Sequence, residues 1–178
     1  MSIAGAILAW RGAERIDTAA GIAQVAAGRF IDVLDGIVAR KTGQTSGFGA
    51  LLDAGLDKAV TAIILYEIKS KNLAPTEIIA AITAFNGINA VASAKMIVEA
   101  GDETVRPEVS GKLALALETS SLLAHLVGSR LETTGQSQLA RVARGIGNLA
   151  FAVSLPFAVK STFSYIKRAR QSKHRNDK

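Results

Sequence analysis

The sequence has no cysteine and few histidines and prolines, and these shortages exclude several kinds of protein. Without cysteine the chain can form neither a disulfide nor a thiolate metal site. With only His125 and His174, it cannot form a di-iron bundle, which needs paired Glu-x-x-His motifs. Three prolines among 178 residues, 49% hydrophobic residues and no sustained alternation of apolar and polar positions favour helices in a chain of single-domain size.

Long uncharged runs are also scarce, although a membrane-spanning helix usually needs about 18 or more apolar residues. The longest uncharged stretch is 78–94, with 17 residues, and the next is 145–159, with 15. On hydropathy alone, a soluble alanine-rich bundle and a membrane bundle are about equally supported. The charges, however, lie mostly at segment ends, and small residues recur in every segment, which lets helices pack closely in lipid. We therefore predict an all-α, polytopic membrane helix bundle.

Polar and turn-forming residues divide the chain into an N-terminal apolar piece and five longer helices. We expect about five to six transmembrane helices with the first one truncated, because only Met1–Trp10 precedes the polar stretch Arg11–Asp17. The predicted segments are 2–10, 18–40, 49–70, 77–100, 110–131 and 139–166.

The net charge of +6 is concentrated at the end of the chain. Residues 167–178 carry six basic side chains and one acidic one, so residues 1–166 carry only +1. A basic segment directly after the last apolar helix is typical of a cytoplasmic, frayed tail at the membrane surface. Alternating helices then place the 41–48 turn and the 101–107 connection on the same side as the tail. A soluble bundle that binds nucleic acid through this tail is the alternative, but the near-neutral body predicts no nucleic-acid partner.

The most informative feature is a set of four aspartates on two neighbouring predicted helices. The segment reads Asp32-x2-Asp35-Gly36-x2-Ala39-Arg40-x8-Gly49-x3-Asp53-x3-Asp57. Spacings of three and four place each pair of acids on one helix face. The short turn makes the two helices antiparallel neighbours, so we expect four carboxylates to converge at one end of the pair.

Four carboxylates held together repel one another unless cations neutralise them. Two divalent cations would balance the four charges, and oxygen ligands favour Mg²⁺ or Mn²⁺. A two-metal carboxylate site is typical of phosphoryl-group chemistry. The small residues Gly36, Ala39 and Gly49 leave room for a phosphate-bearing ligand, which Arg40 can contact. The alternative is a solvated acidic helix end.

At these residues the chain resembles the CDP-alcohol phosphatidyltransferase family, whose signature D-x2-D-G-x2-A-R-x8-G-x3-D-x3-D is matched at every fixed position. The resemblance implies a membrane domain over residues 1–166 that transfers a phosphatidyl group from CDP-diacylglycerol to a small alcohol and releases CMP. Glycerol 3-phosphate is the expected acceptor. Inositol phosphate, another alcohol, or a non-catalytic membrane protein that binds metal or nucleotide are the alternatives. Membrane lipids are expected partners, and a homodimer is left open.

The resemblance also implies roles for individual residues. Asp32, Asp35 and Asp53 correspond to ligands of a two-metal site, and Asp57 corresponds to the general base, which also touches a metal. The positions implied for CDP binding are Gly36, Ala39, Arg40 and Gly49. The alternation of helices from a cytoplasmic tail places the active site on the cytoplasmic side, with the tail.

Three other basic residues and one histidine, all outside the aspartate motif, also have expected roles. By the same resemblance, Lys112, which follows Gly111 at the start of a predicted helix, is a candidate for binding an acceptor phosphate. Lys95, late on the preceding helix, is a second candidate, because a cation inside a bundle suggests a function. The alternative for both lysines is snorkelling to the membrane interface. Arg29 lies one turn before Asp32 and is expected to pair with it. His125, in an apolar helix, is expected to be a packed core residue.

Overall fold

The chain forms six α-helices over the residues that can be described. The computed structural model describes the backbone of residues 3–42, 47–100 and 109–176, and the side chains of residues 4–31, 55–97 and 109–171. Within those backbone ranges all regular structure is helical, so the prediction of an all-α bundle is confirmed. The helices are α1 (Ile3–Glu14), α2 (Ala19–Thr42), α3 (Gly47–Ser70), α4 (Thr76–Ala100), α5 (Val109–Thr133) and α6 (Ser137–Asn176).

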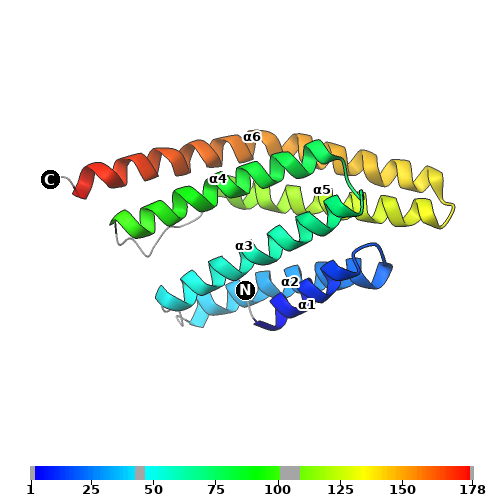
Figure 1. The fold of residues 1–178 in the computed structure, drawn as a ribbon, viewed down its shortest axis with the longest axis horizontal. Helices are drawn as coiled ribbons and strands as arrows, with labels where there is room; N and C mark the ends of the chain where they lie inside the picture. Colours follow the sequence, from blue (N-terminus) through cyan, green and yellow to red (C-terminus); the bar gives the residue numbers. More distant parts are fainter. Residues whose placement is uncertain (1–2, 43–46, 101–108, 177–178) are drawn as a thin grey trace.

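The helices form an elongated bundle of two layers, with α1–α3 in one layer and α4–α6 in the other (Figure 1). The most extensive packing is between α5 and α6, followed by α1 with α2 and α4 with α6. Successive long helices run in opposite directions. The last turns of α2 and α4 and the first turns of α3 and α5 therefore lie at one end of the bundle, here called the motif end (Figure 1). The C-terminal part of α6 extends past the same end, as the alternation of helices predicts.

Within the described residues, two helices are long and apolar enough to cross a bilayer. They comprise Thr76–Ile97, 22 residues of α4, and Ser137–Gln171, 35 residues of α6. Only 22% and 17% of the residues in the tested windows are buried inside the bundle, which differs from the core helix of a soluble protein. In contrast, α1 has 12 residues and a length of about 18 Å. It is shorter than the roughly 30 Å hydrocarbon layer.

Glycines allow α1 and α2 to approach closely. A Cβ atom added to Gly28 of α2 would lie 2.7 Å from the Gly5 carbonyl oxygen and 2.9 Å from the backbone nitrogen of Ala9 in α1. Both neighbours belong to the backbone of a packed helix and cannot move separately. The contact therefore requires glycine, as expected where helix backbones meet.

We predict that Gly28→Ala lowers the free energy of unfolding by about 1–3 kcal/mol, because the added methyl group must push α1 away from α2. The measurement is the thermal unfolding midpoint of the detergent-purified protein. Gly87→Ala in α4 is the matched control, since a Cβ there meets nothing within 4 Å. That control should stabilise the protein by about 0.5–1 kcal/mol through helix propensity. Equal midpoints for both variants would contradict the close packing.

A small polar cluster joins helices at the end opposite the motif end. Lys71 Nζ donates to the Glu14 carbonyl oxygen at 2.8 Å and to Asp17 Oδ1 at 3.0 Å. The hydrogen bond from Lys71 holds the pKa of Asp17 below its ordinary value of 3.8. Because the pKa of Asp17 is lower in the folded than in the unfolded protein, its pair with Lys71 stabilises the fold at pH values above the ordinary pKa. This stabilisation is lost as the pH falls through the folded pKa.

The basic segment after residue 166 differs from the prediction. It was expected to fray, but α6 continues through it to Asn176. Tyr165 and Ala169 are buried against Ala92 and Met96 of α4, and the Arg168 guanidinium lies 5.2 Å from the centre of the Tyr165 ring. Packing on α4 thus supports helical structure beyond the end of the apolar segment.

Candidate functional site

The two halves of the aspartate motif lie on helices that meet at the motif end. Asp32 and Asp35 are in the second half of α2, and Asp53 and Asp57 are in the first half of α3. The antiparallel arrangement of α2 and α3 brings these halves together at the level of the backbone (Figure 1). Asp57 alone among the predicted metal and CDP positions has a described side chain. The other predicted positions lie outside the set of residues with described side chains, and they are Asp32, Asp35, Gly36, Ala39, Arg40, Gly49 and Asp53.

Asp57 is held by an arginine from the neighbouring helix. Arg29 Nη1 lies 2.5 Å from Asp57 Oδ1, and Arg29 Nη2 donates to Thr61 Oγ1 at 2.5 Å. The Thr61 hydroxyl in turn donates to the Asp57 carbonyl oxygen at 2.7 Å. Arg29 is expected to pair with Asp32 on its own helix, and this stays a prediction because the Asp32 side chain lies outside the described set. The guanidinium links α2 to α3 and orients the Asp57 carboxylate.

The two candidate phosphate-binding lysines also belong to the motif end. Lys112 lies in the first turns of α5 and is exposed, and Lys95 is exposed near the end of α4. Both helix ends lie on the same side of the bundle as the ends of α2 and α3 (Figure 1). The backbone therefore places both lysines at the expected end, and their role in phosphate binding stays a prediction.

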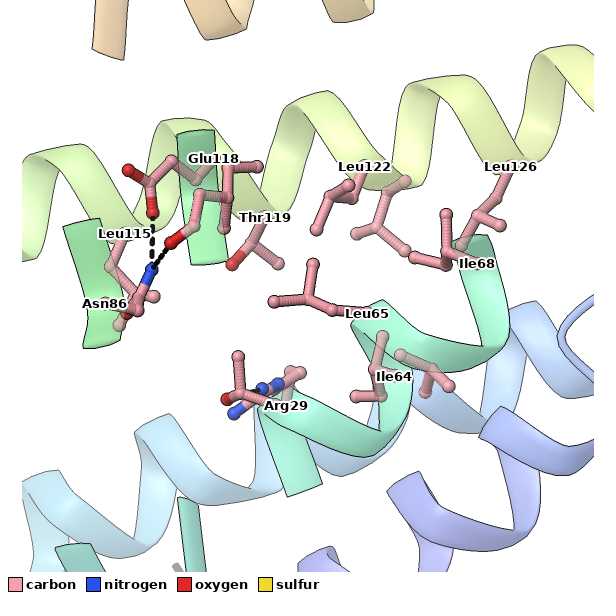
Figure 2. A pocket seen from close by; sticks show the side chains of 14 residues that line it. Arg29, Ile64, Leu65, Ile68, Asn86, Leu115, Glu118, Thr119, Leu122 and Leu126 are labelled. Atoms are coloured by element: carbon pink, nitrogen blue, oxygen red, sulfur yellow. Dashed lines mark hydrogen bonds between the residues drawn. The ribbon is translucent and has the colours of Figure 1, made fainter. Parts of the chain in front are cut away.

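A cavity separates the two layers of helices next to Arg29. Its lining has two different ends, as Figure 2 shows. Arg29, Asn86, Glu118 and Thr119 surround the polar end, which is nearer the start of α5 and thus nearer the motif end. The opposite end is lined by leucine and isoleucine side chains. These are Ile64, Leu65, Ile68, Leu122 and Leu126, among others.

Glu118 is the least expected residue of this lining. It is only 3% exposed, on α5, and it accepts a hydrogen bond from Asn86 Nδ2 of α4 at 3.2 Å. Lys58 Nζ lies 3.5 Å from Asn86 Oδ1 and is the next residue after Asp57. A buried acid in an apolar helix is costly and commonly marks a functional site in a membrane bundle. That signal is readable in the sequence, where Glu118 interrupts the apolar run of the predicted 110–131 helix, although Glu118 is not among the site residues predicted above.

Comparison with known proteins identifies the class to which this site belongs. Residues 1–159 match the sequence profile described as CDP-alcohol phosphatidyltransferase, which includes the complete aspartate motif and five of the six helices. The chain belongs to this family.

Members of the CDP-alcohol phosphatidyltransferase family are membrane-bound transferases of phospholipid biosynthesis, with CDP-alcohol lipids and alcohol acceptors as substrates. A segment of 44 residues is 49% identical to an archaetidylinositol phosphate synthase of Pyrococcus horikoshii. The match covers 25% of this chain and 23% of that protein. No solved structure matches the chain.

The CDP-alcohol phosphatidyltransferase family uses a divalent metal, and the side chains of the motif can be compared with the ligands that such a metal prefers. Among the side chains that the structure describes, no three His, Cys, Asp or Glu residues form a cluster. The donor set fits in its chemistry, because all four motif residues are carboxylates and hard divalent cations prefer oxygen ligands. The binding of metal by all four carboxylates stays a prediction, because it depends on the side chains of Asp32, Asp35 and Asp53, which lie outside the described set.

His125 is buried in this CDP-alcohol phosphatidyltransferase bundle, as the sequence indicates for a core residue. It is 2% exposed, and a Cβ added to Gly147 of α6 would lie 2.9 Å from His125 Cδ2. The imidazole thus packs directly against the α6 backbone. It is absent from the lining of the cavity beside Arg29, so nothing in its position indicates a part in the chemistry.

Proposed function

We propose that this protein transfers a phosphatidyl-type group from a CDP-activated lipid such as CDP-diacylglycerol to a small alcohol, with release of CMP. The observation that carries the proposal is the meeting of both halves of the family motif at one end of antiparallel α2 and α3. Family membership over residues 1–159 supports the reaction class.

In the proposed reaction the acceptor hydroxyl attacks the β-phosphorus of the CDP-lipid. A new phosphorus–oxygen bond forms to the alcohol, the bond from that phosphorus to the bridging oxygen breaks, and CMP leaves with the bridging oxygen. An alcohol has a pKa far above 7, so a carboxylate must accept its proton during the attack. We assign this role to Asp57. Arg29 engages Oδ1 of Asp57 and so orients the carboxylate that accepts the proton.

The remaining motif residues bind and orient the donor substrate in this proposal. Asp32, Asp35 and Asp53, together with Asp57, would hold two Mg²⁺ or Mn²⁺ ions. When bound, such ions stabilise charge on the diphosphate oxygens. Gly36, Ala39 and Gly49 would admit the CDP group close to the helix backbone. Arg40 would contact a phosphate oxygen.

The acceptor is a phosphorylated alcohol in our proposal. Glycerol 3-phosphate is the candidate from the sequence, and Lys112 and Lys95 would bind its phosphate at the motif end. The name of the partly matching relative, an archaetidylinositol phosphate synthase, favours inositol phosphate as the second candidate. Both acceptors combine one phosphate with free hydroxyl groups.

We also propose that the motif end faces the cytoplasm, with the chain as a multi-pass protein of the cell membrane. The basic residues 167–178 support this orientation, because positive charge next to a spanning helix favours the cytoplasmic side. Residues 1–166 would form the catalytic membrane domain. Labelling of single introduced cysteines from either side of sealed vesicles would test the orientation.

The activity test measures CMP release by the detergent-purified protein with CDP-diacylglycerol and Mg²⁺ or Mn²⁺. Glycerol 3-phosphate, an inositol phosphate and unphosphorylated alcohols are supplied separately, and a reaction without acceptor measures hydrolysis. We expect CMP release that depends on one phosphorylated alcohol and a lipid product of matching mass. No CMP release with any acceptor would refute the proposed function.

A further inference from the structure

A second cavity, between α4, α5 and α6, adjoins the cavity beside Arg29 at Glu118. Three residues, Asn86, Leu115 and Glu118, line both cavities. The Asn86–Glu118 hydrogen bond therefore stands in the wall between them. On one side the wall faces the cavity that reaches Arg29, the partner of Asp57, and on the other it faces Gly111, the neighbour of Lys112.

The second cavity contains polar atoms that have no partner. Ser161 of α6 is 1% exposed, and neither its Oγ nor the buried Oδ1 of Asn89 has a hydrogen-bond partner within the described part of the chain. Both residues line the cavity. Buried polar atoms are nearly always satisfied in proteins, so unsatisfied ones at a cavity indicate a ligand or water.

A glycine on α5 lets Ser161 of α6 lie directly against that helix. A Cβ atom added to Gly111 would lie 2.7 Å from Ser161 Oγ. Any larger residue at position 111 would meet the Ser161 hydroxyl, which lines the second cavity. Residues 111 and 118 both line this cavity and are separated by seven helical positions, or about 10 Å along the axis.

The polar groups of the wall and the second cavity match hydroxyl groups. The Glu118 carboxylate and the Asn89 amide oxygen accept hydrogen bonds, while the Ser161 hydroxyl can donate or accept. These atoms belong to three helices, so one ligand that satisfies them needs several donors distributed over its carbon skeleton. An ammonium group carries all its hydrogen-bond donors on one nitrogen atom, whereas a polyol carries separate hydroxyl groups on several carbon atoms.

We propose that Glu118, with Asn86, Asn89 and Ser161, binds the free hydroxyl groups of the acceptor and selects a polyol as the alcohol substrate. This inference rests on the proposed function, since the polyol is the acceptor of that reaction. Glu118 and Asn86 form a specificity site beside the Asp57–Arg29 pair. The phosphate of the acceptor lies toward Lys112, and its hydroxyls lie toward Glu118.

The test uses Glu118→Gln, which keeps the size of the side chain and removes its charge. We expect the KM for the polyol phosphate to rise about 10- to 100-fold, as for loss of a hydrogen bond to a charged group, while the KM for CDP-diacylglycerol stays within about two-fold. Glu77→Gln, at the exposed start of α4, is the matched control and should change neither KM. Equal KM values for Glu118→Gln and the native protein would overturn the assignment.

A second variant excludes a folding defect as the cause. Ser161→Ala removes a hydroxyl that has no described partner, so the unfolding midpoint should not fall while polyol binding weakens about three- to ten-fold. Binding is measured without turnover, as the rise in unfolding midpoint on addition of glycerol 3-phosphate, an inositol phosphate, L-serine or ethanolamine. A larger rise with either amine than with both polyol phosphates would overturn the proposal.

The two measurements separate the two proposals. Polyol-dependent stabilisation that Glu118→Gln removes, without CMP release by the native protein, would support the polyol site and refute the transferase. CMP release with an unchanged acceptor KM in both variants would support the transferase and refute the polyol site. Neither stabilisation nor CMP release would refute both.

Discussion

Asp57→Asn is expected to lower the rate of alcohol-dependent CMP release by about 10²- to 10⁴-fold, the usual contribution of a general base. Asparagine keeps the size of the side chain and can still accept a hydrogen bond from Arg29, but it cannot take the proton of the attacking hydroxyl. The KM for CDP-diacylglycerol should change less than kcat. The measurement is CMP release at saturating acceptor and metal.

Asp17→Asn provides the control for this substitution. Asp17 lies at the end of the bundle opposite the motif end, in an exposed pair with Lys71. Loss of such a pair costs at most about 1 kcal/mol of stability and should leave kcat unchanged. A native rate for Asp57→Asn would remove Asp57 from the role of base. A native rate for both variants would place the chemistry elsewhere in the bundle.

Removal of divalent metal should abolish CMP release. Four carboxylates at the ends of α2 and α3 would leave uncompensated negative charge without cations, and the diphosphate would lose the charges that hold it. We expect EDTA to reduce the rate to that of the reaction without enzyme, and added Mg²⁺ or Mn²⁺ to restore it. Asp53→Asn should lower kcat by about 10²- to 10³-fold at saturating metal, as for removal of one electrostatic contact.

Metal binding can be detected independently of activity. Mg²⁺ or Mn²⁺ should raise the unfolding midpoint of the native protein, because a ligand that binds the folded state stabilises it. The rise should be smaller for Asp53→Asn and unchanged for Asp17→Asn. Ca²⁺, which adapts to irregular oxygen sites, serves as a comparison for selectivity. Full activity after chelation would contradict the two-metal proposal.

The helices could be predicted from the sequence because their boundaries depend on local signals. The second and third helices, expected at 18–40 and 49–70, occur as α2 (Ala19–Thr42) and α3 (Gly47–Ser70). The end of α6 could not be predicted in this way. It depends on burial of Tyr165 and Ala169 against α4, a contact between residues about 75 positions apart in sequence.

The motif could also be identified from sequence, because its spacing fixes the helix face on which each acid lies. The hydrogen-bond partners of the site residues could not be identified from sequence. Arg29 is three positions from Asp32 and 28 from Asp57, so local spacing favours Asp32, and only the fold shows that the guanidinium also reaches Asp57 on α3. Asn86 and Glu118 are separated by 32 residues, and they become neighbours because α4 and α5 both pack on α6.

The continuous helix at the end of α6 limits how the basic residues can meet a membrane. Successive helical positions are rotated by about 100°, so Lys167, Arg168 and Arg170 lie on different sides of the axis. A helix that lies flat on a bilayer needs one apolar and one charged face. The described part of this segment has no such division, so it suits a rod that continues α6 past the end of the bundle rather than a helix that lies flat on a bilayer.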